Sequence, residues 1–142
     1  MNVFIIGMTA EAMANDTRRY NKQIVECNQM LNAIEGKTKS WRKHPCTIQY
    51  EKHRLWLDEY RLCFIAYREG KYARALLHSL IADFVKPSFH KEAFFTQMKR
   101  RLYTKSPNFY AQWAQLGCSL ENWYWSPKEK RIIKYVDGKR VK

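Results

Sequence analysis

One carboxylate lies among cations and amides on a single face of a helix predicted near the start of the chain. This face is formed by residues three and four positions apart, namely Arg19, Lys22, Gln23, Glu26 and Gln29. In a cleft, such a carboxylate can act as a general acid or base, and an amine can act as a nucleophile. On a solvated surface, Lys22 and Glu26 would form only an i,i+4 ion pair worth about 0.2–0.5 kcal/mol. Periodicity alone leaves both interpretations open.

A second group of reactive residue types follows about fifteen positions later, at Trp41-Arg42-Lys43-His44-Pro45. His44 precedes a proline, which favours an extended backbone and a defined side-chain direction. Its ring would donate to a phosphate or a base, or else form a hydrogen bond at a helix N-terminus. Trp41 would stack on a base, enter a duplex as a wedge, or pack in the core.

The charge of the chain is strongly positive. It has 142 residues, with 26 Lys and Arg against 13 Asp and Glu, which gives a formal net charge of +13. Such a field attracts polyanions, with nucleic acid as the first candidate and an acidic membrane surface as the second. The residues expected to contact phosphate, unless they only solubilise the chain, are Lys37, Lys39, Arg42, Lys43, Lys99, Arg100 and Arg101.

Neither a metal nor any other cofactor is expected. The four cysteines are scattered without a Cys-x-x-Cys pair, and the four histidines are not at the spacings of zinc sites. The thiols indicate a reducing compartment, so we expect a cytoplasmic protein. No apolar run approaches the roughly 20 residues of a spanning helix, and residues 1–8 have no basic leader, so neither a membrane protein nor a signal peptide is expected.

The elements that must position these residues are mostly helical. Asp16 or Thr17 is a suitable N-cap for a central helix over residues 17–34, and Gly36 follows in the place of a C-cap glycine. The buried stripe of this helix is formed by Tyr20, Ile24, Cys27, Leu31 and Ile34.

We expect one compact, mostly all-α domain over residues 1–142. It begins with a short extended N-terminal arm, and it ends with a small extended or hairpin segment over residues 123–136. Further helices are predicted over residues 46–69, which would be the longest, and over 71–85, 88–103 and 107–117. The helix over 71–85 has an apolar side formed by Ala73, Leu76, Leu77, Leu80 and Ile81.

The same residues carry a family resemblance. The pattern formed by Asp16, Arg19, Lys22, Gln23, Glu26 and Gln29 is followed by the block at 41–45 and by Tyr50. It resembles small bacterial and phage proteins grouped with the pyrimidine-dimer DNA glycosylases of the endonuclease V type. The resemblance is strongest over about residues 2–67.

The resemblance implies an enzyme that flips a nucleotide, attacks C1′ with an amine, forms a Schiff base and cleaves the backbone by β-elimination. In the best-understood members of that family the amine is the α-amino group of a threonine exposed by Met removal, and a helical Glu is the acid/base. Here Asn2 is too bulky for routine Met removal. The nucleophile is then the Met1 amine or Lys22, or the lyase chemistry is absent. The implied catalytic set is Glu26, Lys22, Met1, Arg19 and His44.

The sequence therefore predicts a base-flipping glycosylase and abasic-site lyase acting on damaged DNA. We expect Glu26, Arg19, Lys22 and His44 to share one cleft, with Glu26 kept ionised by its cationic neighbours. The main alternative is a non-catalytic nucleic-acid-binding or host-directed interaction protein, and the exposed aromatics would also allow an RNA-binding module. The oligomeric state stays open.

Overall fold

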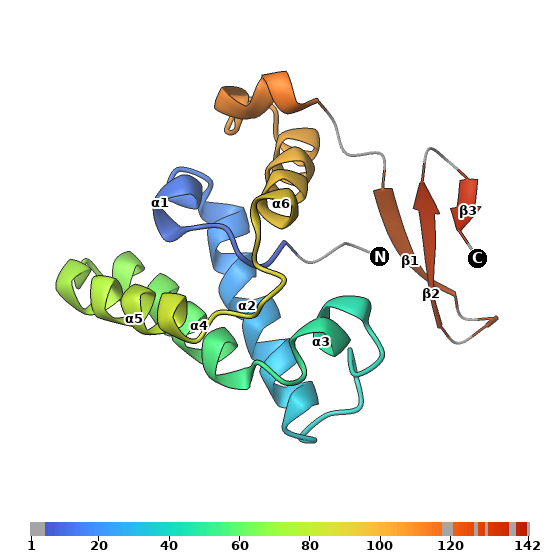
Figure 1. The fold of residues 1–142 in the computed structure, drawn as a ribbon, viewed down its shortest axis with the longest axis horizontal. Coiled ribbons are helices and arrows are strands. Elements are labelled where there is room, and N and C mark those ends of the chain that lie inside the picture. Colours follow the sequence, from blue (N-terminus) through green and yellow to red (C-terminus); the bar gives the residue numbers. More distant parts are fainter. Residues whose placement is uncertain (1–4, 118–120, 127, 130, 137–138, 142) are drawn as a thin grey trace.

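The computed structural model describes residues 5–117, 121–126, 128–129, 131–136 and 139–141. These residues are mostly helical, which confirms the predicted fold class (Figure 1). The helices are α1 Ala10–Met13, α2 Thr17–Ile34, α3 Pro45–Tyr50, α4 Arg54–Arg68, α5 Tyr72–Phe84, α6 Glu92–Lys105 and the 3₁₀ helix η1 Ala111–Leu116. The strands are β1 Glu121–Ser126, β2 Arg131–Val136 and β3 Lys139–Val141.

Helix α2 crosses the middle of the molecule and has the predicted bounds (Figure 1). The Asp16 side chain caps it by accepting from the Arg19 backbone N–H at 3.4 Å, and Gly36 follows its end with a φ of +77°. Its apolar stripe is buried except at Ile34, which is partly buried, and Gln23 and Glu26 on the polar stripe are buried as well. The polar stripe is therefore not a solvated face.

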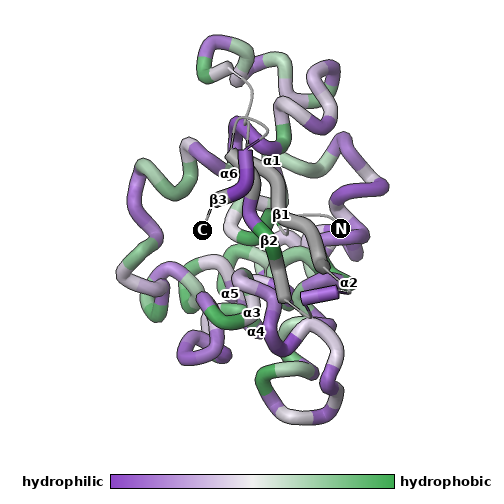
Figure 2. The backbone as a smooth tube through the Cα atoms, turned by 90° about the vertical axis from the view of Figure 1, so that its right-hand side faces the viewer, coloured by the Kyte–Doolittle hydropathy of each residue, from purple (hydrophilic) through white to green (hydrophobic). Residues whose placement is uncertain are grey.

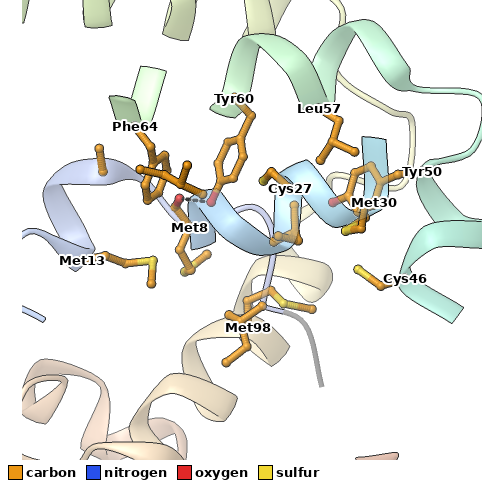
Figure 3. Close-up of a cluster of buried hydrophobic side chains, with 14 of the residues drawn as sticks. Met8, Met13, Cys27, Met30, Cys46, Tyr50, Leu57, Tyr60, Phe64 and Met98 are labelled. Carbon is orange, nitrogen blue, oxygen red and sulfur yellow. Dashed lines mark hydrogen bonds between the residues drawn. The ribbon is translucent and has the colours of Figure 1, made fainter. Parts of the chain in front are cut away.

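The core lies on both sides of α2 (Figure 3). Tyr60 and Phe64 of α4 cover one side, while Met13 of α1 and Met98 of α6 lie on the other. Along the backbone, hydrophobic and hydrophilic residues alternate at short intervals, as amphipathic helices around a common core require (Figure 2).

The long helix predicted over residues 46–69 is wrong, because it is split into α3 and α4. His53 donates its backbone N–H to the Tyr50 carbonyl at 2.8 Å, which closes α3 in a tight turn. The break lets the Tyr50 ring stack on Trp56 at 5.0 Å, whereas residues six apart on one helix point in different directions. As a result, the longest helix among the described residues is α2 and not one within residues 45–70.

Helix α6 begins at Glu92, four residues later than predicted. Phe89 and His90 instead turn toward the aromatic cluster, where the His90 ring packs edge-on against Trp56 at 4.5 Å. A hydrogen bond of 2.6 Å joins His90 Nε2 to the Tyr50 hydroxyl. These buried contacts hold residues 89–90 out of the helix.

The predicted C-terminal hairpin is confirmed. Strands β1 and β2 pair antiparallel, with Glu121 opposite Val136 and Ser126 opposite Arg131. A third strand that the sequence did not predict, β3, pairs antiparallel with β2. The sheet lies at one end of the molecule and α5 at the other (Figure 1).

Candidate active site

Glu26 is the buried acid of the polar stripe on α2. Its residue surface is 6% exposed, and its Oε2 atom is buried with no hydrogen-bond partner among the described residues. Its Oε1 atom lies 3.8 Å from the Nζ atom of Lys22, whose side chain remains 40% exposed. Buried polar atoms in folded proteins are nearly always paired, so an orphaned carboxylate oxygen marks a place prepared for a proton, a water molecule or a ligand.

A small cavity brings Glu26 together with three cationic side chains. It has a volume of about 10 Å³, at the lower limit for one water molecule. Arg19 and Lys22 line it from α2, and Lys105 lines it from the last position of α6. Arg19 is fixed there, because its Nε atom donates to Ser106 Oγ at 3.2 Å and lies 3.4 Å from Asp16 Oδ2. Two segments far apart in the sequence thus build one site.

Burial controls the protonation of Glu26. Desolvation raises the pKa of this carboxyl from 4.5 to about 7, although Lys22, Lys105 and Arg19 each act to lower it. The expectation that its cationic neighbours keep Glu26 fully ionised is therefore wrong, because the loss of water outweighs their attraction. Near neutral pH, Glu26 is present in both its acid and its base form.

Lys105 is the site residue whose importance the sequence did not indicate. Burial lowers the pKa of its amine, and the charges of Arg19 and Lys22 lower it further. In sequence it only extends a basic run at the end of a helix. It nevertheless follows Met98 and Arg101 at steps of three and four, which places it on the buried side of α6. From this spacing the sequence could have placed Lys105 on the buried side of α6.

Gln23 and Tyr60 hold the N-terminal arm beside this cavity. The Gln23 side-chain amide donates to the Ile5 carbonyl and also to the Tyr60 hydroxyl, the latter at 2.7 Å. Tyr60 in turn donates to the Met8 carbonyl at 2.5 Å and accepts from the Gly7 N–H at 3.1 Å (Figure 3). Ile5 itself lines the cavity. The candidate nucleophile Met1 lies outside the described residues.

His44 is placed elsewhere by the structure. It is 2% exposed, and its Nδ1 atom accepts from the Cys46 backbone N–H at 3.0 Å, so it is the N-cap of α3. It is not among the residues that line the cavity around Glu26. Of the two interpretations that the sequence left open, this geometry corresponds to the helix N-terminal hydrogen bond.

The basic loop between α2 and α3 is largely exposed. Lys37, Lys39, Arg42 and Lys43 all lie on the surface. Arg42 also donates to the Ala33 carbonyl at 3.0 Å, which anchors the loop to the end of α2. Trp41 is only partly buried, packs against the core, and has a φ of +66°, a left-handed conformation that is uncommon outside glycine.

The three cations predicted to act together on α6 are separated by the structure. Arg101 is 8% exposed and lies on the core side with Met98 and Leu102, so it is not part of a surface cluster. The reason is the helical repeat, because residues 98, 101, 102 and 105 share one side of α6. Arg100 is half-buried. Lys99 lies 5.9 Å from the centre of the Trp113 ring, in a cation–π geometry.

The described residues were also searched for a metal site, a second cavity and a membrane-spanning helix. They contain no group of three or more His, Cys, Asp or Glu side chains arranged to hold a metal ion. A larger cavity of about 180 Å³ lies between α1, α4 and α5. Its wall combines aromatic side chains with polar and charged ones such as Glu11, Asp83 and Lys86, and it contains none of the site residues predicted from sequence. In the described part of the chain, no helix has the length and apolar character needed to cross a membrane.

Residues 1–67 match the family model described as pyrimidine dimer DNA glycosylase. No curated protein and no solved structure matches the chain. The matched segment contains α2 with Arg19, Lys22 and Glu26, whereas Lys105 and the sheet lie outside it. The resemblance predicted from the motifs is thus confirmed over residues 1–67, a little less than half of the chain.

Proposed function

We propose that the protein is a DNA glycosylase with abasic-site lyase activity, in which Glu26 is the acid/base. The observation that carries this proposal is the buried Glu26 carboxylate, which has one unpaired oxygen and three cationic side chains around it. The family match over residues 1–67 and the net charge of +13 both support DNA as the substrate.

Glu26 suits both proton transfers of such a reaction. A group is most effective in general acid–base catalysis when its pKa lies near the working pH. With a pKa of about 7, the acid form can protonate the departing base, and the resulting carboxylate can then remove a proton from the sugar. A fully exposed glutamate would be almost entirely ionised at this pH and would be a poor acid.

Lys105 is our preferred amine nucleophile. An amine must be neutral to attack, and the lowered pKa of Lys105 increases its neutral fraction. Lys22 is the second candidate, and its Nζ atom lies 3.8 Å from Glu26 Oε1. The Met1 α-amino group is the third, because the arm passes the cavity at Ile5 and four residues span up to about 14 Å.

The proposed reaction releases the damaged base and then cleaves the strand. The neutral amine attacks C1′ of the damaged nucleotide, and the bond from C1′ to the base breaks with its electron pair leaving on the base. Glu26 supplies the proton that the base takes up. The nitrogen then gives up one proton and its electron pair forms the C1′=N bond as the C1′–O4′ bond breaks. The released O4′ takes up that proton as a hydroxyl, which leaves an iminium ion. Glu26 removes a proton from C2′, and the 3′ phosphate departs with the electron pair of its C–O bond. Water finally hydrolyses the iminium ion and restores the amine.

The cavity sets a condition on this reaction. A volume of about 10 Å³ holds no nucleotide, so the sugar must approach from the open side, where the Lys22 side chain is exposed. Arg19 is held rigidly at this edge by Ser106 and Asp16 and would bind a phosphate flanking the damaged site. We assign the remaining phosphate contacts to Lys37, Lys39 and Lys43 of the exposed loop.

Borohydride trapping tests this function. The protein is incubated with a duplex containing one abasic site, or one cyclobutane pyrimidine dimer, and borohydride is added to reduce any iminium ion to a stable crosslink. Peptide mapping then locates the adduct. We expect it on Lys105, with Lys105→Arg abolishing trapping and Lys71→Arg, an exposed control paired with Glu69, leaving it unchanged.

Each outcome of this experiment has a definite meaning. An adduct on Lys22 or Met1 would keep the function and overturn the choice of amine. If no adduct and no cleavage form on any damaged duplex, the glycosylase proposal is wrong. In that case the non-catalytic nucleic-acid-binding function, with Glu26 as a buried relic of the site, takes its place.

A further inference from the structure

Helix α5 presents an apolar face to solvent. Leu76, Leu77, Leu80 and Phe84 are between 55% and 89% exposed. The opposite side of α5 is buried against α4 through small residues, Ala75 and Ala82, which allow the two helices to approach closely. Helix α5 lies at the end of the molecule opposite the sheet (Figure 1). It also lies outside the segment that matches the glycosylase family.

The apolar face has the spacing of a helix–helix contact. Ala73, Leu77, Leu80 and Phe84 follow one another at steps of four, three and four, which is the a/d pattern of paired helices. Helix α4 already packs on the other side, so this stripe has no partner among the described residues. Isolated apolar residues on a surface need no explanation, but a contiguous stripe indicates an interaction site.

The face is also free of charge in a highly charged protein. No Lys, Arg, Asp or Glu occurs between Arg74 and Asp83, although the chain has a net charge of +13. The centres of protein interfaces are depleted of charged residues in the same way, while nucleic acid and acidic membranes require cations. The chemistry of this face therefore favours a protein partner with a matching apolar stripe.

We propose that this partner is a second copy of the chain, with the two α5 helices packed antiparallel about a two-fold axis between His78 and Ser79. In this register the small Ala73 lies level with the large Phe84 of the partner subunit, and Leu77 lies level with Leu80 of the partner subunit. Such pairing of small with large residues fills a helix interface evenly. A two-fold contact uses the same patch on both copies, and this stripe is complementary to itself.

The charges at the edges of the face permit this arrangement. In the antiparallel register, Arg74 of one copy lies nine residues from the level of Arg74 of the partner subunit, about 13 Å along the axis at 1.5 Å per residue. Asp83 of one copy is separated from Asp83 of the partner subunit by the same distance along the axis. Arg74 instead lies level with Asp83 of the partner subunit, which has the opposite charge. Just beyond the helix ends, Lys71 lies level with Lys86 of the partner subunit, but each of these lysines is paired with a carboxylate of its own copy.

The contact is small, which predicts a weak dimer. A contact through a single helix stripe buries less surface on each copy than the about 800 Å² of an interface of standard size. Each copy also carries a net charge of +13, which repels the other at low ionic strength. We therefore expect a dimer that forms in the micromolar to submillimolar range and is strengthened by salt, in contrast to DNA binding, which salt weakens.

Sedimentation equilibrium of the full chain tests the proposal. The wild type should change from monomer to dimer as its concentration rises, and the midpoint should move to lower concentration as salt increases. Leu77→Glu should remain monomeric throughout. Ile48→Glu, which introduces the same charge at an exposed apolar position on α3, should dimerise as the wild type does. A wild type that stays monomeric at several hundred micromolar contradicts the proposal, as does dimerisation of Leu77→Glu equal to that of the wild type.

A crosslink tests the register. In the double variant Ala73→Cys/Phe84→Cys the two new thiols are about 16 Å apart within one helix, too far for a disulfide, but adjacent between copies. Mild oxidation should give dimers linked through positions 73 and 84, whereas Ala73→Cys alone should give no more dimer than the parent chain. An equal yield from the single and double variants would overturn the antiparallel register.

Borohydride trapping by monomeric Leu77→Glu should match trapping by the wild type. The test of the dimer is therefore independent of the glycosylase proposal.

Discussion

Gln23 of α2 donates a hydrogen bond of 2.7 Å to the hydroxyl of Tyr60 of α4, and the two side chains together hold three backbone groups of the N-terminal arm. The arm has few other means of satisfying its backbone at this depth, because residues 5–8 form no helix or strand. The position of the arm relative to Glu26 is thus set by two buried side chains from different helices.

Tyr60→Phe should destabilise the protein and displace the arm. It leaves the Gly7 N–H and the Met8 carbonyl without their partner, which costs about 1–3 kcal/mol in the free energy of unfolding measured with urea. Tyr20→Phe is the matched control, because its hydroxyl donates at 2.5 Å to the Phe64 carbonyl and not to the arm. If the Met1 amine contributes to chemistry, trapping should fall only in Tyr60→Phe. Equal stability of Tyr60→Phe and the wild type would show that these hydrogen bonds do not hold the arm.

His44 should behave as a helix cap. Its Nδ1 atom accepts from the Cys46 N–H, a role that an asparagine oxygen can fill. We expect His44→Ala to lose about 1 kcal/mol of unfolding free energy, and His44→Asn to recover part of that loss while cleaving damaged DNA at the wild-type rate. A stable His44→Asn protein without cleavage would instead favour the catalytic role predicted from sequence.

The exposed loop should determine the salt dependence of DNA binding. Each phosphate neutralised on duplex DNA adds about 0.9 to the slope of log K against log salt. Lys39→Glu/Lys43→Glu should reduce that slope by about 2, as measured by fluorescence anisotropy with an undamaged duplex. Lys71→Glu, on the α4–α5 turn, is the control that shows the effect of one charge reversal outside the loop. An unchanged slope in the double variant would place the DNA elsewhere on the surface.

The sequence was most informative where local signals act alone. The bounds of α2 followed from Asp16 and Gly36, and the motif pattern on its polar stripe led to the family. The division between α3 and α4 was not predictable in this way, because it serves the stacking of Tyr50 on Trp56, a contact that no local pattern reveals. The protonation of Glu26 was missed for a related reason. Neighbours on the same helix are visible in the sequence, whereas the depth of burial under α6 is not.

Glu26 should make stability depend on pH. Its pKa is about 7 in the folded protein and 4.5 in the unfolded chain, so the folded state binds the proton more tightly. Its contribution is therefore fully present below pH 4.5 and is lost as the pH rises through 7. Glu26→Gln lacks this titrating group. The unfolding free energy of the variant minus that of the wild type should therefore rise by about 3 kcal/mol between pH 4.5 and 8. His90, whose pKa burial lowers to about 4, affects both proteins equally and cancels in the comparison. Parallel stability curves for the two proteins would mean that Glu26 titrates normally.

If the buried Glu26 carboxyl performs the proton transfers, Glu26→Gln should bind damaged DNA but cleave it slowly in a single turnover. The substitution preserves size and removes one negative charge, so binding to a damaged duplex should be unchanged or slightly tighter. With excess enzyme on a duplex bearing a pyrimidine dimer or an abasic site, strand cleavage should fall by a factor of about 10²–10⁴, the range typical of a lost general acid/base. Cleavage by Glu26→Gln at the rate of an active wild type would contradict the account.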